Sequence, residues 1–389
     1  MSDAPIRIAG AGPAGLAAAI VLARAGRRVE VCEARGRVGH RFIGDWQVLE
    51  NSSEAEDGAD LLARLGIATN FTFEPERQAV LFDHKLRPRE VRSRRPYGYF
   101  LRRGPVEGTL DRGLLAQAEA AGAEVRFNAR LRPEEAAIVA TGPAQADGLA
   151  REMTFSTPLT DRVWVLFDQR LAPGGYAYLF VRRGFATFGT AIVADFRSID
   201  ARYEACLRRF QELEPFTPQG ERTGYSYMNF TLKATAQRGP TLYAGEAGGF
   251  QDYLFGLGIR YAITTGALAA QAILEGRSYD ELWQAALQRK QRGSVVNRFL
   301  YELGGNAGLA QFVRRAAARD FDSYLAGWHR FAAWKRLLFP LVVRSWRQRA
   351  ACRHNLAEHW CRPPRKGAAG ATPELGEISR PGASQARPD

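Results

Sequence analysis

Three glycines near the start of the chain have the spacing of a phosphate-binding loop. Gly10, Gly12 and Gly15 lie in the run GAGPAG. In such a loop the first glycine permits a tight turn, the second lets the backbone approach a pyrophosphate, and the third lets a helix pack closely on a strand. The unpaired N–H groups at the start of the next helix can then bind phosphate oxygens. The spacing therefore indicates a dinucleotide.

An acidic residue completes this pattern, and the elements around it must position the loop. Glu33 follows Gly15 by 18 residues, where its carboxylate can accept hydrogen bonds from both hydroxyls of an adenosine ribose. A carboxylate there disfavours a ribose 2′-phosphate. Residues 5–35 have the pattern of an apolar strand, a glycine turn, an alanine-rich helix and a second strand. The alternative for this βαβ unit is a glycine-rich turn without a ligand.

Two later segments favour FAD over NAD. Residues 136–153 contain an apolar strand that ends in ATG at 140–142, a close-packed turn that suits a bound cofactor. Residues 240–276 contain a second strand, a glycine-rich loop and another alanine-rich helix that opens with GLGI at 256–259. An extended flavin can use the start of both helices, the first for its pyrophosphate and the second for its ring.

These motifs resemble those of FAD-dependent oxidoreductases with the glutathione-reductase-like fold, a group related to the aromatic hydroxylases. Within that group the chain is most similar to the geranylgeranyl reductase family. Residues 247–259 follow the family run A-(A/G)-G-F-x-D-P-x-x-G-x-G-I, and residues 102–127 resemble the family helix between the first two cofactor segments. The resemblance implies that Arg103 contacts the cofactor. GGYAYLFV at 174–181 resembles the Y-x-W-x-F-P strand that lines the family's substrate cavity.

Several residues depart from the family pattern. Glu246 stands where the family usually has Asp, and Tyr178 stands at the Trp of the substrate strand. In the loop before the second helix, Tyr253 replaces Pro, Phe255 replaces a small residue and Leu257 replaces an acid. We therefore expect surroundings of the flavin ring that are bulkier and more apolar than those of the family. The cysteine-containing segment that follows the ribose acid in many family members is also missing from this sequence.

The residues and the resemblance together predict a site. The residues expected to bind FAD are Gly10, Gly12, Pro13, Ala14, Gly15, Glu33, Ala34, Arg41, Arg103, Ala140, Thr141, Gly142, Gly245, Glu246, Gly256, Leu257, Gly258 and Ile259. Those expected to line the substrate cavity are Tyr176, Tyr178, Phe180, Phe250 and Phe255. The candidate catalytic proton donors are Tyr176, Tyr178 and Tyr253, and the alternative for each is a core aromatic residue with a hydrogen-bonded hydroxyl. No metal site is expected.

The loop after Glu33 carries three further polar residues. His40, Arg41 and Asp45 follow the ribose acid in the run GRVGHRFIGDW. We expect them on the adenosine side of the flavin or at the mouth of the cavity. A loop of solvated charges is the alternative.

The order of segments predicts an α/β fold. A discontinuous, Rossmann-like FAD-binding domain is expected from residues 1–74, 103–155 and 239–278. An antiparallel β-sheet substrate domain is expected from residues 75–102 and 156–238, because the stretches there alternate apolar and polar residues. Residues 279–362 have a helical and basic pattern, and residues 363–389 are rich in Pro, Gly and Ala and are expected to be a disordered tail.

The positive charge of the chain is concentrated near its end. The net charge is +13, and residues 312–366 contain 13 Lys and Arg residues against 3 Asp and Glu residues, together with four of the seven Trp residues. Basic residues between aromatic ones favour an interfacial helix on an anionic membrane. The alternative is a helical cap with solvated arginines. No nucleic-acid partner is expected, because no recognition module accompanies the charge.

The remaining features favour a cytoplasmic protein. The four cysteines are scattered, and the first strand begins at the N-terminus without a secretory signal. The apolar run LLFPLVV at 337–343 is far shorter than the roughly 20 residues that span a bilayer. If the basic region binds lipid, the protein lies at the inner face of the membrane.

The favoured function is an FAD-dependent reductase that adds hydride from flavin N5 to a carbon–carbon double bond of an apolar, isoprenoid or lipid-like small molecule. A second dinucleotide motif is missing, so the reductant is transient NAD(P)H or another electron carrier. One alternative is an FAD-dependent monooxygenase, a hydroxylase or epoxidase, although residues 245–249 lack the His and Pro typical of aromatic hydroxylases. Halogenases are disfavoured because W-x-W-x-I-P is missing. The other alternative is a non-catalytic, membrane-associated flavin-binding protein.

Overall fold

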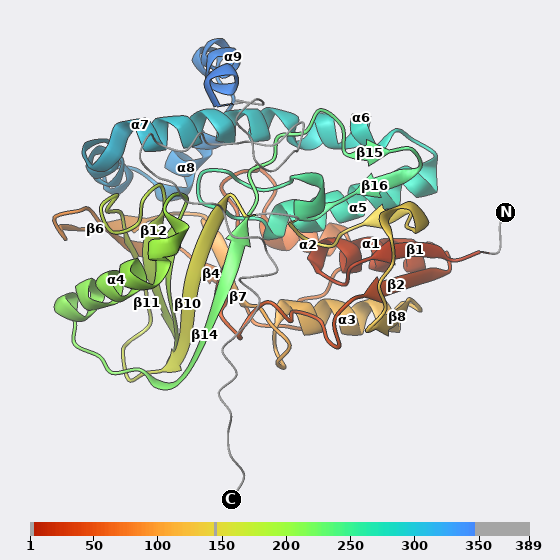
Figure 1. Ribbon diagram of the computed structural model, residues 1–389, viewed down its shortest axis with the longest axis horizontal. Coiled ribbons are helices and arrows are strands. Elements are labelled where there is room, and N and C mark those ends of the chain that lie inside the picture. Colours follow the sequence, from red (N-terminus) through yellow and green to blue (C-terminus); the bar gives the residue numbers. More distant parts are fainter. Residues whose placement is uncertain (1–3, 144–145, 347–389) are drawn as a thin grey trace, which may run out of the picture.

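A computed structural model describes residues 4–143 and 146–346 of the chain. A parallel sheet flanked by helices lies at one end of the molecule (Figure 1), and its strand order is β15-β16-β9-β1-β2-β8. Its strands are β1 (Ile6–Ala9), β2 (Val29–Glu33), β8 (Glu124–Phe127), β9 (Ile138–Val139), β15 (Gln237–Arg238) and β16 (Thr241–Tyr243). All neighbours are parallel except the pair β15–β16. This is a Rossmann-like sheet.

Small residues let the helices of this domain pack closely. The helices are α1 (Pro13–Arg24), α2 (Gly58–Arg64), α3 (Leu110–Ala120) and α5 (Ile259–Glu275). A Cβ on Gly266 of α5 would overlap the carbonyl oxygen of Ala14 in α1. Pro13 at the first position of α1 suits a helix start, because its missing N–H has no helical partner there. The alanine-rich sequence of α1 is thus buried between its neighbours.

A second, larger sheet forms the other end of the molecule (Figure 1), with the order β14-β10-β13-β12-β11-β5-β6. Its strands are β5 (Gln78–Phe82), β6 (Pro88–Arg92), β10 (Gly148–Ser156), β11 (Arg162–Leu166), β12 (Tyr176–Arg182), β13 (Phe185–Ile192) and β14 (Gln219–Met228). Neighbouring strands are antiparallel except β5 and β11, which are parallel.

The two faces of this sheet pack against different parts of the protein. On β12, Leu179 belongs to the cluster that includes Tyr203 and Phe210 of α4 (Ile199–Leu213). Tyr178 belongs to a second cluster with residues of the three-stranded sheet and of the C-terminal helices. We call this second side the inner face of the seven-stranded sheet. The alternation in YAYLF thus separates residues that pack on α4 from residues that point towards the rest of the protein.

A three-stranded sheet joins the two larger ones, in the order β3-β7-β4. Its strands are β3 (Trp46–Glu50), β4 (Phe73–Glu76) and β7 (Gly98–Arg102), and both pairs are antiparallel. Short 3-10 turns complete the fold at Pro133–Glu135, Phe196–Ser198 and Gly245–Gly248.

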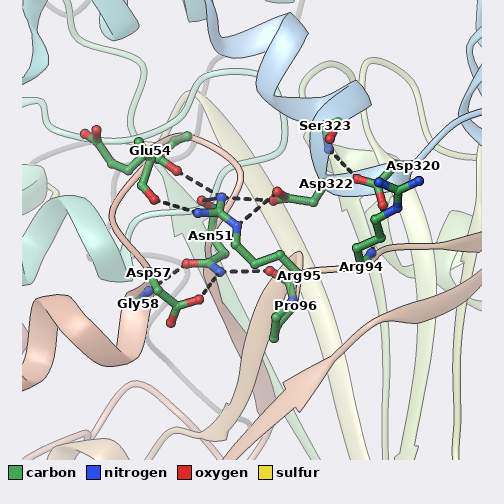
Figure 2. A network of polar contacts seen from close by, with 12 residues as sticks. Asn51, Glu54, Asp57, Gly58, Arg94, Arg95, Pro96, Asp320, Asp322 and Ser323 are labelled. Atoms are coloured by element: carbon green, nitrogen blue, oxygen red, sulfur yellow. Dashed lines mark hydrogen bonds and ion pairs between the residues drawn. The ribbon is translucent and has the colours of Figure 1, made fainter.

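The C-terminal part is helical and lies along one side of both sheets (Figure 1). Its helices are α6 (Tyr279–Trp283), a π-helical turn (Gln284–Gln288), α7 (Arg289–Ala317), α8 (Phe321–His329) and α9 (Ala333–Trp346). Figure 2 shows how α8 is fixed: the guanidinium of Arg95 donates to Asp322 at 3.0 and 3.2 Å and to the carbonyl oxygens of Asn51 and Glu54. Helix α8 is therefore tied to the loop that follows β3.

The predicted α/β class is confirmed, with a Rossmann-like domain, a largely antiparallel sheet and a helical C-terminal region. The segment boundaries differ in two places. Strand β10 lies in the seven-stranded sheet, whereas 103–155 was expected to belong wholly to the FAD-binding domain, because β10 pairs along its length with β13 and β14. The predicted boundary between residues 74 and 75 also falls inside strand β4, which belongs wholly to the three-stranded sheet. Residues 347–389, which include Trp360 and the predicted tail, lie outside the described residues.

Candidate functional site

The glycine loop between β1 and α1 leaves space where a phosphate would approach. Gly10 has φ of 100°, and a Cβ there would lie 2.5 Å from the carbonyl oxygen of Ala140. At Gly12, by contrast, no atom of the described residues other than residues 11–13 lies within 4 Å of the position that a Cβ would take. That open position adjoins the first N–H groups of α1, which are suited to bind an anion. The loop fits a pyrophosphate.

Glu33 is already directed towards this loop. Its carboxylate accepts a hydrogen bond from the backbone N–H of Ala11 at 2.9 Å and another from that of Arg35 at 2.9 Å. A carboxylate oxygen can accept more than one hydrogen bond, so these contacts leave capacity for ribose hydroxyls. Ala34 follows Glu33 at the exposed end of β2. The position of Glu33 is the one expected for an acid that recognises an adenosine ribose.

Three predicted segments meet beside the end of the parallel sheet. The Arg41 guanidinium donates to the carboxylate of Glu246 at 3.1 Å, across 205 residues of sequence. A Cβ on Gly142 would lie 3.8 Å from Nη1 of Arg41. We call the loop at 10–15, Glu33 and this Arg41–Glu246 pair the cofactor cradle.

Arg103 is buried near the cradle, where the charge of Glu246 acts on it. Its guanidinium donates to both carboxylate oxygens of Asp111, at 2.8 and 2.9 Å, and lies 4.1 Å from the ring centre of Phe42. Burial lowers the pKa of Arg103, but the Asp111 carboxylate outweighs this effect and the pKa is raised overall. Arg103 thus keeps its charge inside the protein, in a bidentate ion pair with Asp111.

The predicted second helix start is formed by α5. Its N-cap is Gly258, which brings no side chain to the first N–H groups of the helix. Gly256 has φ of 73°, and a Cβ there would overlap Sδ of Met228. Asp252 shapes the loop, because its carboxylate accepts from the N–H of Phe255 at 2.9 Å and its own N–H donates to the carbonyl of Leu257 at 2.9 Å. The start of α5 therefore has no side-chain cap of its own, and its first N–H groups are suited to a partly negative group.

The predicted aromatic residues divide into two groups. Tyr176, Tyr178 and Phe180 form a row on the inner face, with ring centres 5.9 and 4.7 Å apart. Phe255 lies against Tyr176, at 6.0 Å between ring centres, and its carbonyl oxygen accepts a hydrogen bond from the Tyr176 hydroxyl at 2.7 Å. These four residues form one aromatic wall.

Phe250 and Tyr253 are placed elsewhere, which differs from the prediction. Phe250 packs on Trp283 in the core of the Rossmann-like domain, at 5.2 Å between ring centres. The hydroxyl of Tyr253 donates to the carbonyl of Thr231 at 2.7 Å, and its ring contacts Phe230 in a separate cluster. Both side chains are core aromatics, because the turn at 249–253 directs them away from the inner face.

A pocket of about 190 Å³ opens beyond this wall. It lies between α7, α8 and the loop at 254–255, and its lining is largely apolar. Phe255, Tyr301, Phe312, Tyr324 and Trp328 contribute aromatic rings to it. Phe255 belongs both to the lining of the pocket and to the aromatic wall.

The structure also places a buried acid that the sequence prediction missed. Glu152 of β10 is 3% exposed and accepts a hydrogen bond from the Tyr178 hydroxyl. The side-chain amide of Gln47 donates to Glu152 at 3.0 Å and to Asp45 at 2.7 Å. We call Tyr178, Glu152, Gln47 and Asp45 the buried polar network. A single acid on the buried face of a strand, in GLAREMTFS, was the available signal.

Burial dominates the electrostatics of this network. It raises the pKa of Glu152 to about 7, and the charge of Asp45 adds to the effect. Burial also raises the pKa of Asp45 and, with the Glu152 carboxylate, holds that of Tyr178 well above its usual range. Asp45 is fully buried, whereas His40 is exposed. The alternative interpretation, a loop of solvated charges, therefore does not hold for Asp45.

The comparisons with known proteins agree with this geometry. The NAD(P)-binding Rossmann-like domain family matches residues 8–78. A comparison with curated proteins finds no match. Among solved structures, the chain is similar to a geranylgeranyl bacteriochlorophyll reductase-like protein from Thermoplasma acidophilum, with 18% identity, a TM-score of 0.66, and coverage of 88% of this chain and 98% of that chain.

Two other similar structures have different activities in their names. A flavin-dependent brominase has 15% identity and a TM-score of 0.58, over 88% of this chain and 98% of that chain. The p-nitrophenol 4-monooxygenase of Pseudomonas putida has 15% identity and a TM-score of 0.57, over 83% of this chain and 95% of that chain. At sequence identities this low, the similarity to these structures shows a shared fold only. The chain thus has the fold of flavoprotein oxidoreductases, and the resemblance to geranylgeranyl reductases is confirmed at that level.

Proposed function

We propose that this protein is an FAD-dependent oxidoreductase that reduces a carbon–carbon double bond of an apolar, isoprenoid or lipid-like molecule. The observation that carries the proposal is the open position at Gly12, beside the first N–H groups of α1 and next to a carboxylate suited to ribose. The aromatic wall on the inner face supplies apolar surroundings for a substrate. The cradle and the wall belong to one fold that flavoproteins share.

Each part of the cradle has a role in holding the cofactor. The loop at 10–15 and the start of α1 bind the pyrophosphate, and Glu33 binds the ribose. Glu246, paired with Arg41, and the start of α5 lie on the path towards the flavin ring. Reduced FAD, when bound, supplies a hydride to the substrate. The apolar wall orients the substrate and excludes water, which lowers the entropic part of the barrier.

A monooxygenase is the second candidate, and the likeness of the fold to p-nitrophenol 4-monooxygenase favours it. The reductase is preferred because the TM-score to the reductase-like protein is higher, 0.66 against 0.57. The run GEAGG at 245–249, without the His of the aromatic hydroxylases, supports the same choice. Transient NAD(P)H or another electron carrier would reduce the flavin.

Anaerobic reoxidation separates the two candidates. Purified protein with FAD is reduced with NADPH, or with dithionite if NADPH fails, and geranylgeraniol is then added without oxygen. The reductase proposal predicts that the absorbance of oxidised flavin returns on this addition. Flavin that stays reduced until oxygen is admitted, with oxygen uptake that the alcohol stimulates, would instead establish the monooxygenase.

We also propose a peripheral contact between α9 and an anionic membrane. Trp334, Leu337 and Leu341 are 48%, 78% and 63% exposed, and their spacing places them on one side of the helix. Helix α9 lies at the edge of the molecule in Figure 1 and packs on α7 through its other side, where Val342 is buried. Within residues 4–143 and 146–346, no helix is both long and apolar enough to cross a bilayer.

Vesicle sedimentation tests this contact. The protein should sediment with vesicles that contain phosphatidylserine, and Leu337→Glu should weaken that binding because it places a charge on the apolar side of α9. Leu303→Glu, at a 71% exposed position on α7, is the matched control and should bind as the wild type does. Equal binding of the two variants would refute a contact through α9.

A further inference from the structure

We propose that Tyr178 is the group that protonates the substrate and that Glu152 returns the proton to Tyr178. This inference rests on the proposed reductase function, because hydride addition to a double bond leaves the second carbon in need of a proton. The observations that carry it are the burial, the register and the hydrogen bonds of the buried polar network.

The register of three strands brings the two groups together. Tyr178 of β12 and Glu152 of β10 both pair with Gly189 of β13, which lies between them. A Cβ on Gly189 would overlap Cζ and the hydroxyl oxygen of Tyr178. The missing side chain therefore gives the tyrosine ring room to cross β13 and reach the carboxyl of Glu152. A glycine at this register position is what permits the contact.

The network continues to a second carboxyl on another element. The amide of Gln47 bridges Glu152 and Asp45, and the N–H of Ile43 donates to Asp45 at 3.0 Å. Two buried carboxyl groups near one another oppose double ionisation, since like charges in a medium of low polarity repel strongly. The pair can therefore hold one proton near neutral pH, which is the condition a proton reservoir requires.

The groups that face the network come from every neighbouring element. On its own sheet these are Tyr176 of β12 and Ser226 of β14, whose hydroxyl bonds to Glu152. Facing Asp45 are Arg102 and Arg103, and Arg222 acts on Arg102 from β14. The arginines stabilise charge on Asp45. Glu152 is therefore the member of the pair that retains the proton.

The chemical step balances without a further reactant. A hydride adds to one alkene carbon, and the O–H bond of Tyr178 breaks as a C–H bond forms at the other carbon. For this step the hydrogen bond between the two oxygens reverses, because the Tyr178 O–H turns to the alkene and protonated Glu152 donates to the Tyr178 oxygen. The O–H bond of Glu152 breaks as its proton passes to that oxygen, so no tyrosinate accumulates. Glu152 is left as a carboxylate that accepts from Gln47, and a proton from solvent restores it. The alkene gains two electrons, a hydride hydrogen and a proton.

Infrared spectroscopy tests the proton reservoir without any substrate. The carboxylic-acid C=O band of the purified protein is followed from about pH 5 to about pH 9. The wild type should show a band that titrates near neutral pH, Glu152→Gln should lose it, and Tyr178→Phe should shift it. Glu204→Gln, at an exposed position of α4, is the matched control and should keep it unchanged. The same band in Glu152→Gln as in the wild type would overturn the assignment.

Turnover tests the transfer. With reduced FAD and geranylgeraniol, Tyr178→Phe and Glu152→Gln should each slow substrate reduction by about 100-fold while flavin content and circular dichroism stay those of the wild type. Wild-type rates in both variants would overturn the inference. If the wild type itself fails to reduce the alcohol but shows the titrating band, the proposed function is contradicted and the proton-holding pair is not.

Discussion

The cofactor cradle and the buried polar network are the two halves of the proposed site, and the chain encodes them differently. Most of the cradle is a contiguous run of 24 residues from Gly10 to Glu33, in which glycines meet local backbone requirements. The network joins β12, β10 and the segment at 45–47, which are far apart in sequence. Local requirements restrict residue type strongly and are therefore readable. A contact between distant strands depends on register, which the sequence specifies only indirectly.

If the cradle and the network are independent, a substitution in one should leave the other unchanged. The largest effect is expected for the FAD affinity of Gly12→Val. The valine would fill the open position where a phosphate approaches, so we expect at least a hundredfold loss of FAD affinity, or about 3 kcal/mol. The fold should persist because nothing in the described residues occupies that position. The flavin absorbance of the purified variant measures its bound FAD, and its circular dichroism measures whether the fold persists. Gly304→Val, which also has open space, should retain its flavin.

Gly189→Ala makes the opposite change, to the network alone. Its Cβ would overlap Tyr178, so the ring must shift and lose its bond to Glu152. We expect a free energy of unfolding lower by about 1–3 kcal/mol in urea, with the FAD content unchanged. In the matched variant Gly224→Ala the Cβ meets only the side chain of Ile43, at 3.1 Å, so the loss should be smaller. A variant of Gly189 that loses FAD would show that the halves are coupled.

The pH dependence of stability should reveal the network as well. The pKa of Glu152 is raised from 4.5 to about 7 in the folded protein. The folded state therefore holds a proton that the unfolded state has released, and stability falls as pH rises from about 4.5 to about 7. The slope from this group is at most about 1.4 kcal/mol per pH unit. Urea unfolding of Glu152→Gln should show a flatter profile, and an identical slope would contradict the raised pKa.

The smallest loss of FAD affinity is expected for a substitution of Arg41, at the edge of the cradle. Arg41 is 32% exposed, so solvent screens its ion pair with Glu246, and such pairs contribute about 1 kcal/mol or less. Arg41→Ala should weaken FAD binding by no more than about fivefold in a fluorescence titration. A loss as large as that of Gly12→Val would mean that Arg41 contacts the cofactor directly.

The sequence predicted the elements that form the cradle, and it predicted the inner face of the sheet in part. The βαβ unit, Glu33 and the inward alternation of Tyr176, Tyr178 and Phe180 follow from local patterns. Phe250 and Tyr253 were misplaced because a glycine-rich loop has no periodicity from which side-chain direction can be deduced.

The acid partner of the network could not be deduced in the same way. Glu152 becomes notable only when β10 is aligned with β13, and that pairing spans a long connection. Strand β10 was itself expected in the other domain, because its sequence continues directly from the ATG turn at 140–142. Tertiary pairing, not local preference, decides the sheet to which such a strand belongs.

We propose that this fold, with FAD in the cradle, reduces a double bond. Mass spectrometry of geranylgeraniol after anaerobic incubation with the FAD-loaded protein and NADPH or dithionite tests it most directly. We expect a product heavier by two hydrogen atoms for each bond reduced, formed without oxygen and lost in Gly12→Val. A product that forms only in air and carries an oxygen atom from O₂ would contradict it.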